Sequence, residues 1–236
     1  MLGTWINTGT VIIGAIIGLL AGERIPERYR RLVTSVIGLI TLVLGVRFAI
    51  ETGNVIVLLI ASLLGGVLGT ALRIEERIRN AGEALKRKWP RLAQGPIGEA
   101  LVTSAVLFCV GPMTILGSLR DGLYGDWQLL GLKAILDGVS SIVLAAGLGS
   151  GVLWSAGVVF VVQGGISLGA RLLAGGQVLG VVETSPILGE LDAVGGVILI
   201  ALALKLLELR DLKPGNLLPA LACAPLLAWV AGLLNL

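Results

Sequence analysis

Long apolar runs, separated by short breaks that contain charges, glycine or proline, dominate this chain. A helix needs about 20 apolar residues to cross the hydrocarbon core of a bilayer, and helices satisfy their own backbone hydrogen bonds there. The sequence therefore predicts an all-α polytopic membrane protein with about eight transmembrane helices. The expected spans are 4–22, 33–51, 54–72, 99–119, 129–148, 152–170, 189–208 and 216–234.

Composition supports a membrane location. Of the 236 residues, 56% are hydrophobic and 14% are charged, whereas soluble domains carry about 25% charged residues. The 35 glycines suit closely packed membrane helices. The net charge of +3 comes from basic residues that flank apolar runs, so we expect contact with membrane lipids and no nucleic-acid partner.

Catalytic and metal-binding motifs are missing from the sequence. There is no histidine, and Cys109 and Cys223 lie in separate apolar runs, so neither a zinc site nor a disulfide framework is predicted. No phosphate-binding loop, HExxH, GxSxG or dinucleotide fingerprint occurs. We expect no cofactor and no enzymatic activity; an intramembrane enzyme using carboxylates is the least favoured alternative.

The distribution of basic residues predicts the orientation. Most of the 18 Lys and Arg residues fall in the breaks after the first, third and seventh spans, and basic loops usually remain cytoplasmic. We therefore expect both termini outside and a cytoplasmic basic loop over 73–97. Within it, Arg73–Trp89 has helical spacing and mixed charge, which fits either a helix along the membrane surface or a solvated connector.

A weak internal similarity suggests an inverted repeat within one membrane domain, 1–236. The segment from Val36 to Arg47 can be aligned with that from Val194 to Lys205, and each is followed by a Gly-Asn pair. The two copies would be 4–72 and 152–234, around a central helix pair over 99–148. An offset of five spans inverts one copy, as in many secondary transporters, although glycine-rich segments also align by chance.

Asp137 is the residue that most strongly suggests a function. A charged side chain near the bilayer centre costs roughly 2.5–3.5 kcal/mol on insertion scales, and it usually faces a cavity or the bundle interior. Lys133, Asp137, Ser140 and Ser141 have spacings that place them on one helix face. This face can bind a hard cation or a proton. Alternatively, Lys133 and Asp137 form an ion pair that only joins helices.

Two further sequence features suggest residues of the same site. Gly111-Pro112 lies midway along the fourth span, where proline kinks or breaks a helix and frees carbonyl groups. Gln163 lies midway along the sixth span and should hydrogen-bond inside the bundle. It either reaches the Asp137 site or ties two helices together, and the kink is either part of the site or a simple bend.

Small residues at four-residue spacing predict close helix contacts. They form two series, Gly14, Gly18 and Gly22 in the first span and Gly65 and Gly69 in the third. The pattern fits contacts within one chain or between subunits, so a homo-oligomer is left open.

The central region resembles a known family. The stretch from Gly111-Pro112 through Arg120-Asp121-Gly122, then Lys133-Ala and Leu136-Asp137-Gly138, is similar to the core of the YqgA/YdfK family of bacterial membrane proteins. The chain ends, Met1-Leu-Gly-Thr and Gly215-Asn216, are similar too. The resemblance implies a bacterial inner-membrane location; the function of this family is not known, so no functional residues follow from it.

Together these features favour a secondary transporter or channel for a small solute or ion, with a cation or proton site near the midplane. The expected site residues are Asp137, Ser140, Ser141, Gly111, Pro112, Gln163 and Lys133. The alternative is a structural or regulatory membrane protein that docks lipids or a partner through the basic 73–97 segment.

Overall fold

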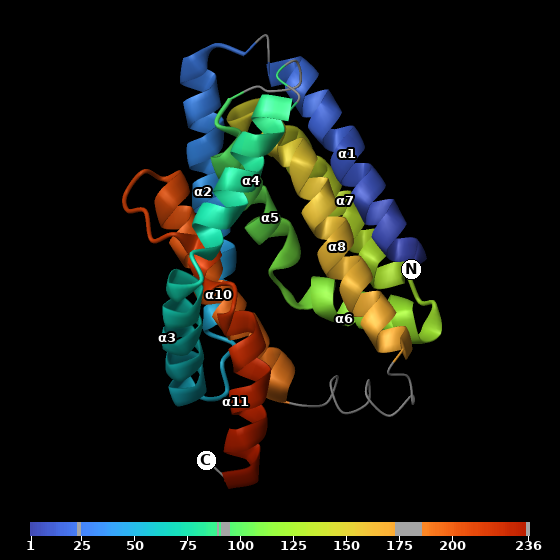
Figure 1. Cartoon of the computed structure of the whole chain (residues 1–236), viewed down its shortest axis with the longest axis vertical. Coiled ribbons are helices and arrows are strands. Elements are labelled where there is room, and N and C mark those ends of the chain that lie inside the picture. The colour runs from blue at the N-terminus through green and yellow to red at the C-terminus, as the bar shows by residue number, and fades with distance from the viewer. Residues whose placement is uncertain (23–24, 89, 91–94, 173–185, 235–236) are drawn as a thin grey trace.

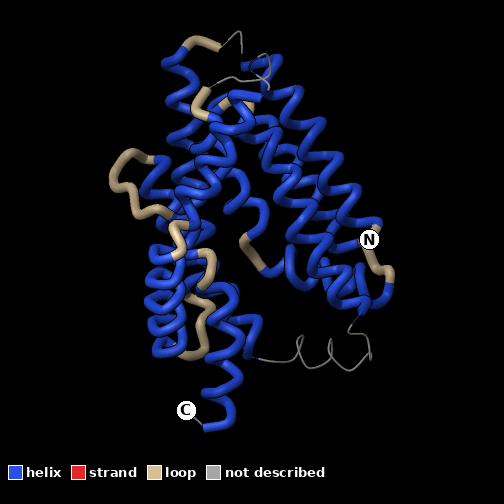
Figure 2. Tube along the Cα trace, in the orientation of Figure 1, coloured by secondary structure: helices blue, strands red, loops and turns tan. Residues whose placement is uncertain are grey.

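The structure is a computed structural model that describes residues 1–22, 25–88, 90, 95–172 and 186–234. Within these ranges the regular secondary structure is entirely helical (Figure 2). The helices are α1 (Leu2–Gly22), α2 (Glu27–Ala49), α3 (Val55–Ala71), α4 (Ile74–Lys88), α5 (Ile97–Cys109), α6 (Pro112–Tyr124), α7 (Gln128–Leu148), α8 (Gly151–Leu172), α10 (Pro186–Leu206), the short 3₁₀ turn η2 (Pro214–Leu217) and α11 (Ala220–Leu234).

These helices confirm the all-α membrane fold. Among the described residues, six helical segments are long and apolar enough to cross a bilayer. Two bent helix pairs raise the number to eight if each pair counts as one span. The first pair is α3 with α4, bent by 48°, and the second is α5 with α6, bent by 63°.

The helices form two groups with α5 between them (Figure 1). In the first group, α1 runs parallel to α7, since Gly3 contacts Leu130 and Gly22 contacts Ala146. Gly14 and Gly18 lie against the α7 backbone, where an added Cβ would overlap carbonyl oxygens. The predicted glycine series thus makes contacts within the chain, and α8 completes this group against α1, α5 and α6.

In the second group, α2 packs antiparallel to α10. Gly45 lies against Gly196 and Ile200, and Gly38 lies against the C-terminal end of α10. The other face of α10 joins α3 and α11 in an apolar core that includes Ile198, Leu202, Ala61 and Ala224. The predicted Gly65 and Gly69 of α3 contact Ala220 and Asn216, again within the chain.

The mixed-charge helix predicted over 73–89 is present as α4 from Ile74 to Lys88, and residue 89 lies outside the described part of the chain. Gly82 packs against Gly98 of α5, and Glu75 is buried. Basic residues of α4 are exposed: Arg77, Arg79, Lys86, Arg87 and Lys88. The helix is therefore amphipathic, with one side on the bundle and a basic side facing away.

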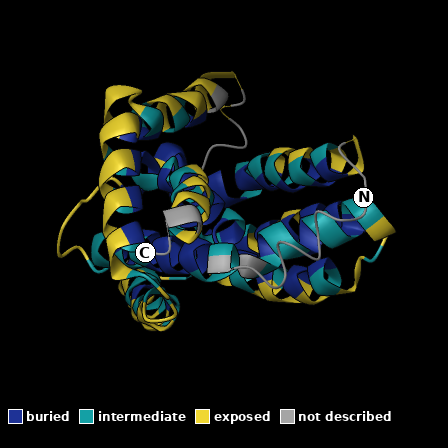
Figure 3. Ribbon diagram, turned by 90° about the horizontal axis from the view of Figure 1, so that it is seen from below, coloured by how far each residue is buried: buried dark blue, intermediate teal, exposed yellow. Residues whose placement is uncertain are grey.

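Large apolar side chains cover the outer surface. On the peripheral helices, the exposed residues lie along the outer side of the ribbons (Figure 3). Ile13 of α1, Val43 of α2 and Val67 of α3 are 60%, 68% and 67% exposed. Such a surface favours contact with lipid, because soluble proteins rarely expose large apolar patches.

Candidate functional site

Lys133 and Asp137 form a buried ion pair on α7. They are one helical turn apart, and the Lys133 ammonium lies 2.8 and 2.7 Å from the two carboxylate oxygens of Asp137. Both residues are buried, at 7% and 6% exposure. Removing two charges from water is costly, and close contact within the pair offsets part of this cost.

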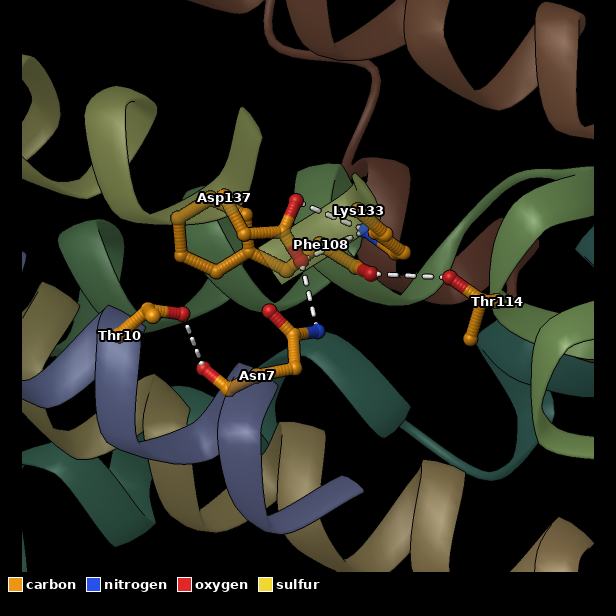
Figure 4. A network of polar contacts seen from close by, with 6 residues as sticks. All are labelled: Asn7, Thr10, Phe108, Thr114, Lys133 and Asp137. Atoms are coloured by element: carbon orange, nitrogen blue, oxygen red, sulfur yellow. Dashed lines mark hydrogen bonds and ion pairs between the residues drawn. The ribbon is translucent and has the colours of Figure 1, made fainter. Parts of the chain in front are cut away.

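Asn7 of α1 is a third member of this group (Figure 4). Its amide Nδ2 donates to Asp137 Oδ2 at 2.9 Å, and its own backbone carbonyl accepts a hydrogen bond from the Thr10 hydroxyl at 2.9 Å. The parallel packing of α1 on α7 brings together two residues that are 130 positions apart. All three partners in the cluster are therefore side chains, which can change rotamer without any movement of the backbone.

The break between α5 and α6 lies beside this cluster. Gly111 has φ +130° and ψ 160°, a conformation that residues with a Cβ rarely adopt. The Thr114 hydroxyl donates to the Phe108 carbonyl at 3.1 Å across the break. The end of α5 and the start of α6 consequently meet inside the bundle, where their partial negative and positive charges act on nearby groups.

A cavity of about 660 Å³ adjoins the ion pair. It lies between α2, the α5–α6 break and α7, and its polar lining consists of Thr41, Arg47, Thr114, Lys133, Asp137 and Ser140. Apolar lining residues Ile40, Leu136 and Val139 are 57%, 58% and 60% exposed. The cavity therefore opens sideways between α2 and α7, toward the lipid-facing surface.

The cavity includes some of the residues expected from sequence and not others. Lys133, Asp137, Ser140 and Gly111 line it, and Pro112 begins α6 at the break. Ser141 lies outside it: the Ser141 hydroxyl donates to the Gly138 carbonyl at 2.8 Å and packs against Gly14.

Gln163 also lies outside this cavity. It is fully buried on α8, and neither atom of its amide has a hydrogen-bond partner among the described residues. Ser141 therefore packs against α1, and Gln163 is buried on α8. Neither residue lines the cavity.

Sequence reasoning did not identify Asn7 and Arg47 as site residues. Asn7 lies with Thr4 and Thr8 on one face of an apolar helix, a polar stripe that indicates an internal position without naming its partner. Arg47 is a basic residue at the end of a span predicted to lie outside, an exception to the charge pattern of the other loops. Both signals were visible, but neither specifies a contact.

The charges of the cavity lining favour a small polar or charged ligand. Lys133 and Asp137 neutralise one another, so Arg47 leaves the lining with a net positive charge. The carboxylate of Asp137 and the hydroxyl oxygens of the lining can bind a proton or a monovalent cation only when the Lys133 ammonium moves away from Asp137. No cluster of three or more His, Cys, Asp or Glu residues that fits a metal ion occurs in the described ranges.

Comparison with known proteins agrees with the resemblance found in the sequence. The chain is 31% identical over 234 residues to the "Uncharacterized membrane protein YdfK" of Bacillus subtilis (strain 168), covering 98% of this chain and 96% of that protein. It is 28% identical over 237 residues to the "Uncharacterized protein YqgA" of Escherichia coli (strain K12), covering 98% of both. No solved structure matches the chain. Residues 2–229 match the model of the family described as "Protein of unknown function (DUF554)", and the chain therefore belongs to that family.

Proposed function

We propose that this protein is a secondary transporter or channel for a small solute or ion, in which Asp137 binds the transported or coupled cation or proton. The observation that carries the proposal is a buried, ion-paired carboxylate that lines a cavity beside a broken helix. Ionisable residues inside membrane spans commonly mark ion pathways. Broken helices commonly form the sites of transporters.

The Lys133 ammonium is a tethered competitor for the carboxylate. It contacts both oxygens of Asp137, which are the atoms that an incoming cation or proton must reach. Binding of such an ion separates the pair and frees Lys133, which can then turn toward the cavity and bind an anionic group of a solute. This exchange couples two ligands without any covalent chemistry, and an ion gradient would supply the energy because the chain has no ATP-binding motif.

The lining of the cavity supplies the remaining ligand contacts. Ser140 and Thr114 provide hydroxyl groups, and Arg47 provides a positive charge at the edge. The positive end of α6 adds to the attraction for an anionic group, while the end of α5 favours a cation. A small solute that carries both charges matches this lining well.

We further propose an eight-span topology in the bacterial inner membrane, with both termini outside and the 73–97 segment cytoplasmic. Because α2 and α10 each precede a Gly-Asn pair, they are the corresponding helices of the two proposed copies, 4–72 and 152–234. Their antiparallel packing supports an inverted relation between these copies. Cysteine accessibility in a variant without Cys109 and Cys223 tests the orientation. Ala84 of α4 is exposed, so Ala84→Cys should react only after the membrane is permeabilised; labelling in intact cells would reverse the topology.

A flux assay in liposomes tests transport. Purified wild-type protein should carry at least one ion or solute from a panel of protons, monovalent cations and small zwitterions, and Asp137→Asn should abolish this flux. Asp211→Asn is the control, because that side chain is 59% exposed. Equal flux in wild type and in folded Asp137→Asn would contradict the proposal.

A second function, docking of anionic lipid, is favoured by the exposed basic side of α4. A further cavity of about 630 Å³, lined among others by Arg30, Arg31 and Lys205, lies near the ends of α2, α7 and α10. Each Lys or Arg near an anionic membrane surface contributes about 1 kcal/mol. Normal growth and regulation in cells that carry Asp137→Asn, combined with their loss on removal of the α4 charges, would favour this function.

A further inference from the structure

Buried polar groups without partners concentrate at one place in the bundle. Five side chains there have buried N or O atoms with no hydrogen-bond partner among the described residues: Thr4, Asn7 and Thr8 of α1, Ser118 of α6 and Gln163 of α8. Thr8 is 8% exposed and the other four are fully buried. We refer to these five residues as the polar strip.

Contacts between α1 and α8 place most of the strip in one region of the bundle. Trp5 and Phe160 have ring centroids 4.8 Å apart, and a Cβ added to Gly164 would lie 3.7 Å from Thr4. Val159 of α8 belongs to the same apolar core cluster as Val11 of α1. Gln163 lies one turn beyond Val159 on the same buried side of α8, and it is therefore level with the Thr4–Thr8 segment of α1.

α6 packs against the same part of α8. The Ser167 hydroxyl of α8 donates to the Ser118 carbonyl of α6 at 2.9 Å, and Ser167 lies one turn beyond Gln163. α5 and α6 follow one another along α8, because the start of α8 contacts the start of α5 and Ser167, near the other end of α8, contacts Gly122 of α6. Ser118 thus lies within the same three-helix space as Gln163.

Both ends of the polar strip contact a buried carboxylate. At one end, Asn7 uses its Nδ2 atom on Asp137, whereas its Oδ1 atom has no partner among the described residues. At the other end, Asp121 Oδ2 accepts hydrogen bonds from the backbone N–H groups of Gly3 at 3.1 Å and Thr4 at 3.4 Å. The strip therefore extends from the ion pair to the end of α6.

The chemistry of the strip selects its ligand. Buried donors and acceptors that lack partners are costly, and in folded proteins they are usually satisfied by ordered water. The five side chains are neutral amides and hydroxyls that both donate and accept, which suits water better than a bound ion. We propose that the polar strip holds a file of water molecules that connects Asp137 with Asp121.

This water gives Asp137 a polar route through Asn7, which contacts Asp137 but does not line the laterally open cavity. A carboxylate with a cavity on one side and a water file on the other can exchange protons with both. The role of the file in translocation rests on the proposed function, whereas the presence of water in the strip does not.

Hydroxyl-radical footprinting of the full-length protein in detergent tests the presence of water directly, because radicals form at ordered waters and modify adjacent side chains. Leu130 is the reporter: it is fully buried and contacts Gly3 and Gly117, the neighbours of Thr4 and Ser118. Leu202 is the matched control, since it is equally buried in the apolar core around α10. Leu130 should be modified several-fold faster than Leu202, and equal rates would overturn the proposal.

Gln163→Leu and Thr8→Val provide a second measurement. Removal of polar groups from a hydrated strip should lower the Leu130 modification rate toward that of Leu202 without raising the melting temperature. A dry strip would instead become more stable, since each substitution removes an unsatisfied buried group; a higher melting temperature with an unchanged Leu130 rate would refute the water file. Fast Leu130 modification in a protein that carries no flux would retain the water file and reject the proposed function.

Discussion

Asp137, in the middle of α7, is buried in a different way from the two carboxylates that bind the Gly-Asn segments of this protein. Glu75 of α4 accepts from the Lys205 ammonium at 2.7 Å and from the Gly215 backbone N–H at 2.8 Å. Glu190 of α10 accepts from the backbone N–H groups of Gly53 and Asn54 at 2.8 and 2.7 Å. Asp137 accepts from side chains and lines a cavity.

Under the proposed function, this difference separates carboxylates that hold the structure together from one that binds a ligand. A carboxylate that binds backbone N–H groups fixes the position of a segment, and its partners cannot leave without local unfolding. A carboxylate that binds two side chains can exchange them for a ligand by rotamer changes. Burial alone therefore does not distinguish such carboxylates, and we use the kind of group that each one binds, backbone or side chain, to separate them.

Removal of the Glu75 carboxylate should have the largest effect on stability. Glu75→Ala leaves Lys205, which is 12% exposed, without its shortest ion pair and the Gly215 N–H without an acceptor. Loss of one partner from a buried pair costs about 3–5 kcal/mol. Denaturant titration in detergent measures the change, with Glu76→Ala on the same helix as the control. A loss as small as that of the control would place Glu75 among the exchangeable carboxylates.

Glu190→Ala should cost somewhat less. The backbone groups that it binds are partly open to solvent, so water can replace some of the lost bonds. Hydrogen bonds to charged groups contribute about 1.5–3 kcal/mol each, and we expect a total loss of about 2–3 kcal/mol. The same titration should show almost no change for Glu51→Ala, whose side chain is exposed.

Replacement of both members of the α7 pair should change stability least among the charged positions. In Lys133→Leu with Asp137→Leu, no charge is left unpaired, and such replacements are often neutral or stabilising. We expect a stability change within about 1 kcal/mol and complete loss of flux. Lys133→Leu alone should destabilise strongly, because the carboxylate remains buried without its ammonium.

The corresponding double variant at Glu75 and Lys205 sharpens the comparison. Glu75→Leu with Lys205→Leu still leaves the Gly215 backbone N–H without its carboxylate acceptor. This double variant should therefore remain destabilised, unlike the α7 double variant. Equal stability of the two double variants would remove the distinction drawn between the carboxylates.

Much of the fold was predictable because its determinants are local. Apolar runs end at glycine, proline or charged residues, and most observed helix ends lie within about three residues of the expected ones, within the usual uncertainty of such boundaries. The break at Gly111 and the Lys133–Asp137 pair are also local, since each is set by neighbours within a turn. The fourth span, expected over 99–119, contains this break as a full separation of α5 from α6.

The rest of the site depends on packing between distant helices. Asn7 meets Asp137 only because α1 lies parallel to α7 through glycine contacts, and no spacing within either helix encodes that register. Ser140 and Ser141 share a broad polar face in sequence, but successive residues differ by about 100° around a helix. The position of α1 then decides which of the two serines faces the cavity.

Substitution of these two serines should give the smallest effects and tests the boundary of the site. The Ser141 hydroxyl bonds to its own helix at Gly138, so Ser141→Ala removes one neutral hydrogen bond; it should change stability by about 1 kcal/mol or less and leave flux unchanged. The Ser140 hydroxyl faces the cavity, where loss of one neutral hydrogen bond to a ligand costs about 1 kcal/mol. Ser140→Ala should therefore raise KM for the transported solute roughly fivefold, since 1.4 kcal/mol corresponds to tenfold, with little change in melting temperature. A larger effect on KM from Ser141→Ala than from Ser140→Ala would place the ligand between α1 and α7, rather than in the cavity beside α2.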